Sequence, residues 1–144
     1  MHRFQYPAIL VQEKKGFTIR FADLPEAITS GKNRKDAIIQ AADCLEEAIA
    51  ARIADGLEIP RPSSVKRNHV LVTVPAPTAA KAALYLAMRE ARMKNTELAH
   101  RLGCDEKEVR RMLDPRHPTK LPRIQEALAA LGKRLVVSME GEAA

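Results

Sequence analysis

Hydrophobic and polar residues alternate along the start of the chain in the pattern of β-strands. Residues 5–11 are apolar on both faces, which indicates a strand that is covered on two sides or paired at an edge. Residues 17–21 place Phe17, Ile19 and Phe21 on one face and polar side chains on the other. The polar segment between these two runs ends in a glycine, which predicts a tight turn. The chain is therefore expected to begin with a β-hairpin.

A helical pattern follows, and a third strand comes after it. Ser30 or Asn33 can cap a helix that Gly56 would end. The apolar residues of this helix recur at spacings of three and four: Ile38, Ala42, Leu45, Ile49 and Ile53. Residues 57–68 contain two prolines and are expected to be an extended connection, and residues 69–74 alternate like a strand. The front of the chain is thus predicted to be a small β-β-α-β unit.

The rest of the chain has helical spacing. One helix is expected from residue 78 to residue 93, and two shorter helices are expected within residues 95–113. Gly103 can separate the two short helices by taking a positive φ angle, and Asp105 can cap the second one. Their inward-facing residues are predicted to be Leu98, Ala99, Leu102, Val109, Met112 and Leu113. This arrangement is a helix-turn-helix pattern.

The chain is expected to end in a helix and a short strand. The last helix begins near Pro122 and is marked by Ile124, Leu128 and Leu131. Residues 134–139 have the pattern of a short terminal strand. Because a lone strand leaves its backbone groups unpaired, we expect two chains to pair their terminal strands.

The change of pattern divides the chain into two expected domains, residues 1–75 and residues 76–144. The fold class is therefore predicted to be α+β, with a small mixed domain followed by an all-α domain that ends in the short strand. The chain has 144 residues and is 46% hydrophobic, which is enough for two small cores. Small cores of this kind are often completed by self-association.

The net charge of +6 is unevenly distributed. Residues 1–75 carry 11 Lys and Arg against 9 Asp and Glu, whereas residues 76–144 carry 13 against 9. The surplus favours the second half as the part that binds a polyanion. No apolar run is long enough for a membrane span and no signal peptide is recognisable, so a cytoplasmic protein without a membrane partner is expected.

No catalytic, metal or cofactor site assembles in the sequence. A metal-dependent nuclease needs several converging carboxylates, and the core-facing strand positions Phe17, Ile19 and Phe21 are not acidic. The four histidines are scattered along the chain. Cys44 and Cys104 lie in separate expected helices without further ligands nearby, so both are predicted to be reduced, partly buried thiols. We therefore expect a non-enzymatic protein without cofactors.

Two stretches resemble known families. Leu98-Ala99-x-x-Leu102-Gly103, followed by Ile124-x-x-x-Leu128-x-x-Leu131-Gly132-Lys133, resembles the phage-repressor (Xre-type) helix-turn-helix. Gly16-Phe17-Thr18-Ile19-Arg20-Phe21-Ala22-Asp23-Leu24-Pro25-Glu26-Ala27, with Thr29-x-Gly31 and a helix near Asp36-Ala37, resembles the HicB antitoxin signature. The two resemblances occur in the order of the longer, helix-turn-helix class of HicB proteins.

This resemblance implies a partial ribonuclease-H-like fold for the first domain and an antitoxin function for the chain. The first domain would cover a small basic ribonuclease toxin, HicA-like, and so stop messenger cleavage. Acidic residues that could meet such a cationic partner lie on the loop after the second strand and on the following helix: Asp23, Glu26, Asp43, Glu46 and Glu47.

The second domain would repress the shared promoter by binding operator DNA, as a homodimer or a higher oligomer such as a tetramer. Main-chain amides at Asn95 and the side chains of Arg92, Lys94, Thr96, Arg116, Thr119 and Lys120 are the expected phosphate contacts. Lys107 and Arg110 are the candidates for guanine edges, Glu106 could accept from a cytosine amine, and Arg111 could face the backbone or solvent. Glu106 and Arg110 could also pair with each other at i,i+4.

Two other functions stay open at the level of the sequence. A stand-alone repressor with a ligand-sensing first domain would need a pocket rather than a flat surface in that domain. A metal-dependent nuclease would need Asp23 and Asp43 for its cleavage activity. Both differ from the antitoxin hypothesis in lacking a toxin as the partner.

Overall fold

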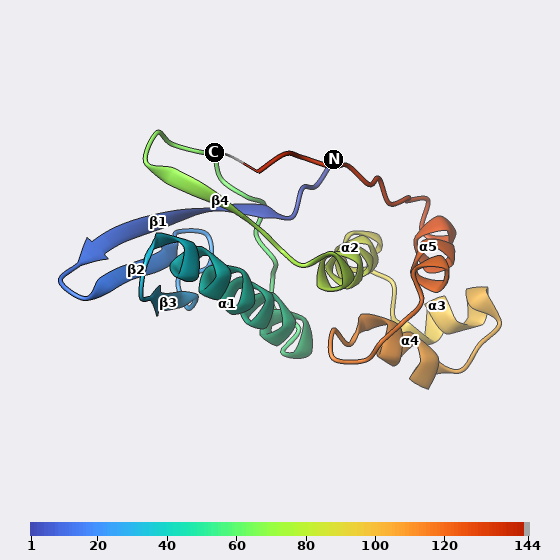
Figure 1. Cartoon of the computed structure of the whole chain (residues 1–144). Coiled ribbons are helices and arrows are strands. Elements are labelled where there is room, and N and C mark those ends of the chain that lie inside the picture. Colours follow the sequence, from blue (N-terminus) through green and yellow to red (C-terminus); the bar gives the residue numbers. More distant parts are fainter. Residues whose placement is uncertain (143–144) are drawn as a thin grey trace.

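The computed structural model describes residues 1–142 and combines a four-stranded antiparallel sheet with five helices (Figure 1). The mixed α+β class expected from the sequence is therefore confirmed. Along the chain the elements are β1 (Gln5–Glu13), β2 (Gly16–Phe21), β3 (Ile28–Gly31), α1 (Arg34–Ala54), β4 (His69–Thr73), α2 (Ala76–Ala91), α3 (Asn95–Leu102), α4 (Glu106–Leu113) and α5 (Leu121–Ala130).

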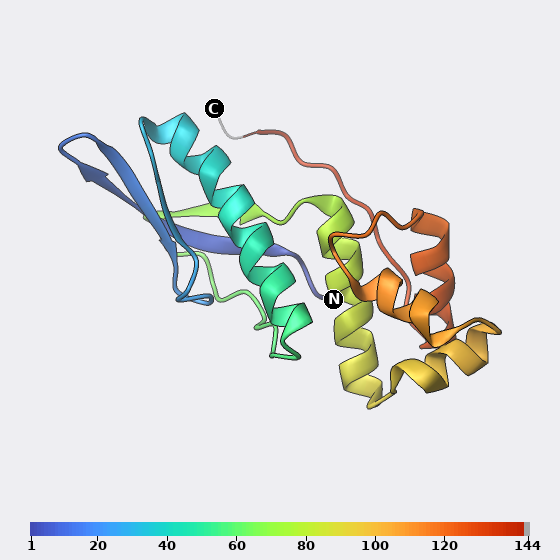
Figure 2. The same ribbon diagram turned by 90° about the horizontal axis from the view of Figure 1, so that it is seen from below.

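The sheet has the order β3-β2-β1-β4, with β2 and β1 as its two interior strands. Leu10 pairs with Ile19 on β2, and Tyr6 pairs with Val72 on β4, so apolar side chains from three strands share one face. The helix α1 lies across this face (Figure 2). Gly16 has a φ of +130° and forms the turn between β1 and β2, as the sequence predicts. The hairpin and the strand at residues 69–74 are thus confirmed.

The third strand, β3, was not expected, so the predicted β-β-α-β order is wrong and the observed order is β-β-β-α-β. Residues 28–31 pair with β2 at the edge of the sheet, Ile19 opposite Thr29 and Phe17 opposite Gly31. The segment is only four residues long, and Thr29 and Ser30 give it no apolar alternation. It forms because the edge of β2 is free to pair with it. This edge exists only in the folded sheet, so the sequence of residues 28–31 does not predict the strand.

The helix α1 follows directly from β3 through a short capped turn. Asn33 accepts a hydrogen bond from the Asp36 N–H at 2.8 Å, and Asp36 in turn accepts from the Lys32 N–H at 2.9 Å. Of the two expected caps, Ser30 and Asn33, the structure therefore uses Asn33. Leu45, Ile49 and Ile53 of the predicted stripe are buried, together with the neighbouring alanines Ala37, Ala41 and Ala48.

Two hydrophobic clusters form the interior, and α2 contributes to both. The first cluster lies between the sheet and α1 and includes Ala82 and Tyr85 of α2. The second cluster joins α2 to α3, α4 and α5 and includes Leu84 and Met88 of α2. Because residues three and four apart on a helix lie on neighbouring faces, α2 can be buried on two sides at once. It therefore stands between the sheet and the helical half (Figure 1).

The predicted terminal strand is not present in the described chain. Residues 131–142 contain no strand and run from α5 back toward the sheet, where Gln5 donates a hydrogen bond to Glu140 at 3.0 Å (Figures 1 and 2). The side chains of Val136, Val137 and Met139 are 67%, 84% and 96% exposed. A strand needs a neighbouring strand that pairs with its backbone N–H and C=O groups. No strand in the described part of this chain pairs with the segment.

Within residues 1–142, none of the helices is both long and apolar enough to cross a lipid bilayer.

Gly31 is required where β3 meets α1, and its substitution gives a test of the fold. A Cβ built at this position would lie 2.3 Å from the Ala37 backbone nitrogen and 2.5 Å from the Ala37 Cα. Backbone atoms cannot give way as a flexible side chain can, so we expect Gly31→Ala to lower the free energy of unfolding by about 1–3 kcal/mol. Urea denaturation measures this change.

Gly141→Ala is the matched control, because nothing lies within 4 Å of its added Cβ. We expect the control to stay within about 0.5 kcal/mol of the unsubstituted protein. Equal stability of the two variants would contradict the close approach of β3 and α1.

Candidate functional site

The junction of α3 and α4 has the geometry that the sequence predicts. Gly103 ends α3 with a φ of +66°, and the Cys104 N–H donates to the Ala99 carbonyl at 3.0 Å, which closes the helix end. Asp105 caps α4 by accepting a hydrogen bond from the Lys107 N–H at 2.9 Å. The inward faces of both helices pack into the second cluster, with Leu98 and Val109 fully buried. The chain therefore forms two separate helices at this point.

The charged residues of α4 lie on its outer face, as predicted. Lys107 and Arg110 are exposed, and Arg110 forms an ion pair with Glu106 at 3.3 Å, the i,i+4 pair that the sequence suggested. Lys94 stands immediately before α3 and Asn95 is its first residue. The first turn of α3 thus offers backbone N–H groups without intrahelical partners beside exposed polar side chains.

A groove of about 480 Å³ separates α4 from the segment that precedes α5. It brings together four of the residues predicted to contact DNA, Lys107, Arg111, Thr119 and Lys120, and it adds His117, Arg123, Asp105, Glu108, Met112 and Pro118. The other predicted contacts lie outside its lining: Arg92 and Lys94 between α2 and α3, Asn95 and Thr96 on the first turn of α3, Glu106 and Arg110 on α4, and Arg116 after α4. The cations of the groove outnumber its carboxylates, so the groove suits an anionic ligand.

The groove is shaped by the segment of residues 114–120, which we call the α4–α5 loop. Asp114 accepts a hydrogen bond from the Arg116 N–H at 3.0 Å, and the His117 N–H donates to the Asp114 carbonyl at 3.0 Å. Arg123, on the first turn of α5, holds Glu108 at 2.8 Å and Glu126 at 2.9 Å. These bonds tie the loop and α5 to α4.

Sequence reasoning missed Lys81, the residue of α2 that contacts the loop from inside. Lys81 is only 2% exposed, and its Nζ donates to the carbonyl oxygens of Arg111 and Asp114 at 2.8 and 2.6 Å. The same Nζ contacts the His117 carbonyl and the Thr119 Oγ1, the latter at 2.8 Å. Its place on the apolar stripe of the helix, three residues before Leu84, was the signal that could have found it.

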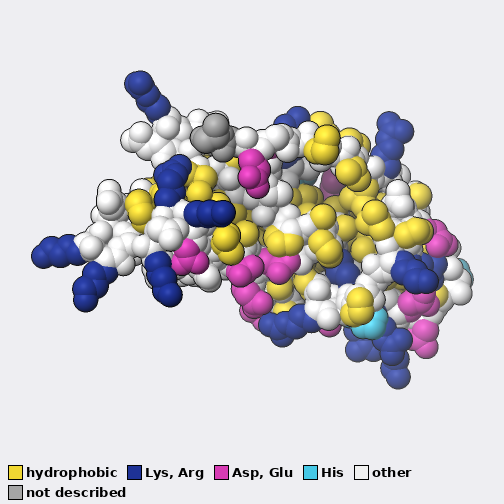
Figure 3. Space-filling view, viewed as in Figure 1, with side chains coloured by type: hydrophobic (Ala, Val, Ile, Leu, Met, Phe, Trp, Pro, Cys, Tyr) yellow, Lys and Arg dark blue, Asp and Glu magenta, His cyan; other side chains and the backbone are white. Residues whose placement is uncertain are grey.

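The five acidic residues predicted to meet a protein partner fall into two groups. Three are engaged within the chain: Asp23 accepts from the Ser63 N–H and hydroxyl, Glu26 pairs with Arg52, and Glu46 accepts from the Thr78 hydroxyl at 2.8 Å. Asp43 and Glu47 are exposed on α1, with Glu47 3.9 Å from Arg116 of the loop. Figure 3 shows acidic side chains gathered over α1, between basic groups at the two ends of this face.

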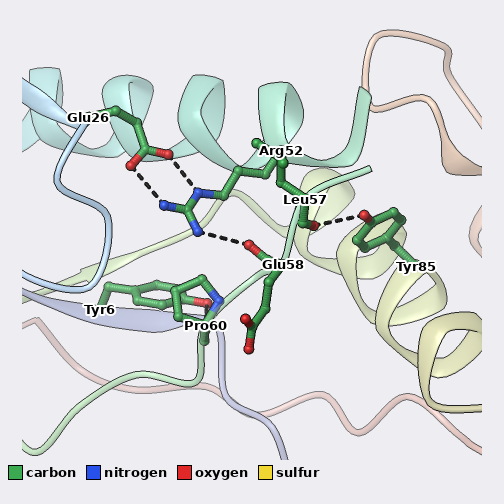
Figure 4. A network of polar contacts seen from close by, with 7 residues as sticks. All are labelled: Tyr6, Glu26, Arg52, Leu57, Glu58, Pro60 and Tyr85. Carbon is green, nitrogen blue, oxygen red and sulfur yellow. Dashed lines mark hydrogen bonds and ion pairs between the residues drawn. The ribbon is translucent and has the colours of Figure 1, made fainter. Parts of the chain in front are cut away.

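Arg52 is the centre of the polar network drawn in Figure 4. Its Nε and Nη2 donate to the two Glu26 oxygens at 2.6 and 2.9 Å, and its Nη1 donates to the Glu58 carbonyl at 2.8 Å. The hydroxyl of Tyr6 donates to the Pro60 carbonyl, and that of Tyr85 donates to the Leu57 carbonyl. The connection between α1 and β4 is therefore fixed by hydrogen bonds from α1, β1 and α2.

The described residues hold no group of three or more His, Cys, Asp and Glu side chains that could bind a metal ion. Cys44 and Cys104 are both free thiols, in agreement with the sequence, and burial raises the pKa of each. A thiol with a raised pKa carries less thiolate at neutral pH and is a poorer nucleophile. A second depression, of about 360 Å³, is open to solvent and lined by residues of the N-terminal segment, such as His2 and Arg3, and of the connection between α1 and β4, such as Arg61.

Comparison of the sequence with known proteins shows similarity to bacterial antitoxins. A sequence profile described as the HicB-like antitoxin of bacterial toxin–antitoxin systems matches residues 5–83. Antitoxin HicB 2 of Photorhabdus laumondii is 39% identical over 131 residues, which cover 91% of this chain and 93% of that protein. Antitoxin HicB of Escherichia coli is 33% identical over 136 residues, 94% of this chain and 99% of that protein.

The pairing of Glu26 with Arg52 makes a pH-dependent contribution to stability that can be measured. The hydrogen bond from Arg52 lowers the pKa of Glu26. A carboxyl group whose pKa is lower in the folded state stabilises the protein above its unfolded pKa, and this contribution disappears as the pH falls through the folded pKa. We expect Glu26→Gln to lower the free energy of unfolding by about 1 kcal/mol at neutral pH, because the pair is partly exposed and screened by solvent.

The difference between Glu26→Gln and the unsubstituted protein should shrink toward zero below about pH 4, as the carboxylate becomes protonated. Urea denaturation at a series of pH values gives the comparison, and Asp43→Asn on the exposed face of α1 serves as the control. A pH-independent difference would show that packing, and not the charge of Glu26, is responsible.

Proposed function

Because the chain belongs to the HicB-like antitoxin family of bacterial toxin–antitoxin systems, we propose that it neutralises a HicA-like, messenger-cleaving toxin and represses its own operon. As an antitoxin of this family it is a regulatory protein and not an enzyme. The observation that carries the proposal is the similarity to proteins named antitoxin HicB along nearly the whole length of the chain. The toxin and operator functions are assigned to different parts of the fold.

Toxin binding is assigned to the first half of the chain, residues 1–75, which lies almost entirely within the matched segment 5–83. A messenger-cleaving toxin must itself bind a polyanion and so presents a cationic surface. The acidic side chains over α1 support this face as the docking surface, with Asp43 and Glu47 as its exposed members (Figure 3). The other three acidic residues of the predicted set already bind neighbouring segments of the chain and would affect toxin binding only through the fold: Asp23, Glu26 and Glu46.

Operator binding is assigned to residues 76–144, with α3 and α4 as a helix-turn-helix of the Xre type. The positive φ of Gly103 and the outward direction of Lys107 and Arg110 support this assignment. In such a unit α4 would lie in the major groove, where Lys107 and Arg110 could reach guanine edges and Glu106 a cytosine amine. Lys94, Asn95, Thr96, Arg111, Arg116, Thr119 and Lys120 would contact phosphates, which agrees with the cationic groove beside α4.

A homodimer is the oligomer we propose, with a tetramer left open. One helix-turn-helix reads only half of a symmetric operator, and two half-sites lie about one helical turn apart. The exposed apolar side chains Val136, Val137 and Met139 support the C-terminal segment as a contact between copies. Pairing of these segments would satisfy their backbone groups.

The toxin assignment predicts that the chain protects messenger RNA from the ribonuclease encoded next to its own gene. In a cleavage assay with that purified product, we expect full protection by the unsubstituted chain and a loss of about tenfold or more in inhibitory potency for Asp43→Lys/Glu47→Lys. Reversing two charges opposite a cationic surface turns attraction into repulsion. Glu97→Lys on α3 is the matched control and should inhibit normally. Failure of the unsubstituted chain to protect the RNA would refute the toxin assignment.

The operator assignment predicts salt-dependent binding to a duplex that carries the promoter region of its own gene. Lys107→Ala/Arg110→Ala should weaken binding by about 1–3 kcal/mol for each base edge that is no longer recognised. Lys14→Ala/Lys15→Ala in the β1–β2 turn is the control, because it also removes two exposed cations and this turn lies at the opposite end of the molecule from α4 (Figure 1). Fluorescence anisotropy at several salt concentrations measures both effects. Equal weakening in the double variant and the control would mean that only overall charge matters.

A further inference from the structure

Lys81 is the one charged side chain that is fully buried among the described residues, and its surroundings are unusual for a lysine. The residue is 2% exposed and lies on α2 beside the second hydrophobic cluster. Its Nζ is surrounded by the carbonyl oxygens of Arg111, Asp114 and His117 and by the Thr119 Oγ1. A buried ammonium group costs several kcal/mol in lost hydration, so these oxygens must offset that cost.

The geometry matches the chemistry of an ammonium group at the end of a helix. Lysine has three N–H donors and no acceptor, and all four neighbouring atoms are oxygens that can accept. Arg111 and Asp114 lie at the C-terminal end of α4, where each carbonyl accepts one backbone hydrogen bond, from the Asp114 N–H at 3.3 Å and from the His117 N–H at 3.0 Å, and has a second lone pair left for Lys81. A positive charge at this end is also favourable to the helix dipole. Lys81 therefore closes the end of α4 from the side.

The same side chain fixes the course of the α4–α5 loop. Its contacts to Asp114, His117 and Thr119 are distributed along the seven residues from 114 to 120, so the loop is held at its start, middle and end. Arg116, Thr119 and Lys120, which the proposed function assigns to phosphate contacts, lie within this stretch. A side chain contacts a phosphate only when it lies at the right place beside the duplex. Several residues of the loop can therefore make such contacts together only if the loop has one fixed conformation.

We propose that Lys81 is a positioning residue for nucleic-acid binding, which holds the α4–α5 loop so that its polar side chains reach the duplex backbone while α4 lies in the groove. This inference rests on the proposed operator binding. Lys81 itself does not reach the DNA, since its Nζ is enclosed by the loop. The residue acts from α2, the helix that the first half of the chain also packs against.

The test combines Lys81→Met with Lys120→Ala. Methionine matches the apolar stem of lysine as far as Cε but lacks the ammonium group, so the four oxygens lose their common donor. Lys133→Met makes the same chemical change at an exposed lysine that pairs with Glu90, and it serves as the control. Binding is measured by anisotropy with the promoter-region duplex at several salt concentrations.

We expect Lys81→Met to weaken duplex binding about tenfold or more and to reduce the salt slope by about one to two units, one for each of the two loop cations, Arg116 and Lys120, that no longer reaches a phosphate. Lys133→Met should change neither quantity to this extent. In the unsubstituted background Lys120→Ala should weaken binding, whereas in the Lys81→Met background it should have little further effect. Such non-additivity is the sign that Lys81 acts through the loop.

Two further measurements separate positioning from general destabilisation. Amide hydrogen exchange of residues 114–120 should become faster in Lys81→Met, while that of α1 and the sheet stays unchanged. Toxin protection, which depends on the first half of the chain, should be retained. If Lys81→Met does not fold, Lys81→Gln provides the second variant: its side chain is shorter, has two N–H donors and no charge, and can hold at most two of the four oxygens, so it should also weaken binding and reduce the salt slope.

The outcomes distinguish the inference from the proposed function. If the unsubstituted chain does not bind the promoter duplex, the operator assignment is wrong and this inference fails with it. If the chain binds but Lys81→Met or Lys81→Gln retains the full affinity and salt slope, only the inference is wrong. It is also wrong if Lys120→Ala costs the same in both backgrounds, because Lys81 would then support the fold without placing the loop.

Discussion

The burial of α2 on two sides is the constraint on which the rest of the structure depends. Ala82 and Tyr85 complete the cluster beneath the sheet, and Leu84 and Met88 complete the cluster of the helical half. Because α2 supplies buried side chains to both clusters, each half would expose apolar surface without this shared helix. The proposed toxin-binding and operator-binding parts are therefore joined through a packed helix and not through a loose linker.

Polar side chains strengthen this junction where apolar packing alone would leave backbone groups unpaired. Tyr85 and Arg89 of α2 donate to the carbonyls of Leu57 and Gly56, and Thr78 donates to Glu46 of α1. On its other side, α2 holds the end of α4 through Lys81. A buried polar group is costly without its partner, so each of these bonds favours one arrangement of the two halves over others.

Ion pairing decides which charges are available to partners. Glu26, Glu108 and Glu126 are used within the chain, as are Arg52 and Arg123. Acidic groups remain over α1 (Figure 3), and the groove beside α4 has more cations than carboxylates, although Arg110 of α4 is paired with Glu106. This arrangement suits a protein that meets a cationic toxin at one surface and a polyanion at another.

The sequence by itself determined the elements whose periodicity is strong: the hairpin, α1, and the two helices on either side of Gly103, including the Asp105 cap. Only the tertiary structure decided the rest. The strand β3 has no apolar pattern and forms because β2 has a free edge, whereas residues 134–139 have a strand-like pattern but no partner strand in the described chain. The sequence places Lys81 on an apolar stripe but does not show which atoms its ammonium group contacts, because the four oxygens come from α4 and the α4–α5 loop. Local pattern fixes the conformation of a segment, but pairing and burial depend on what the fold brings beside it.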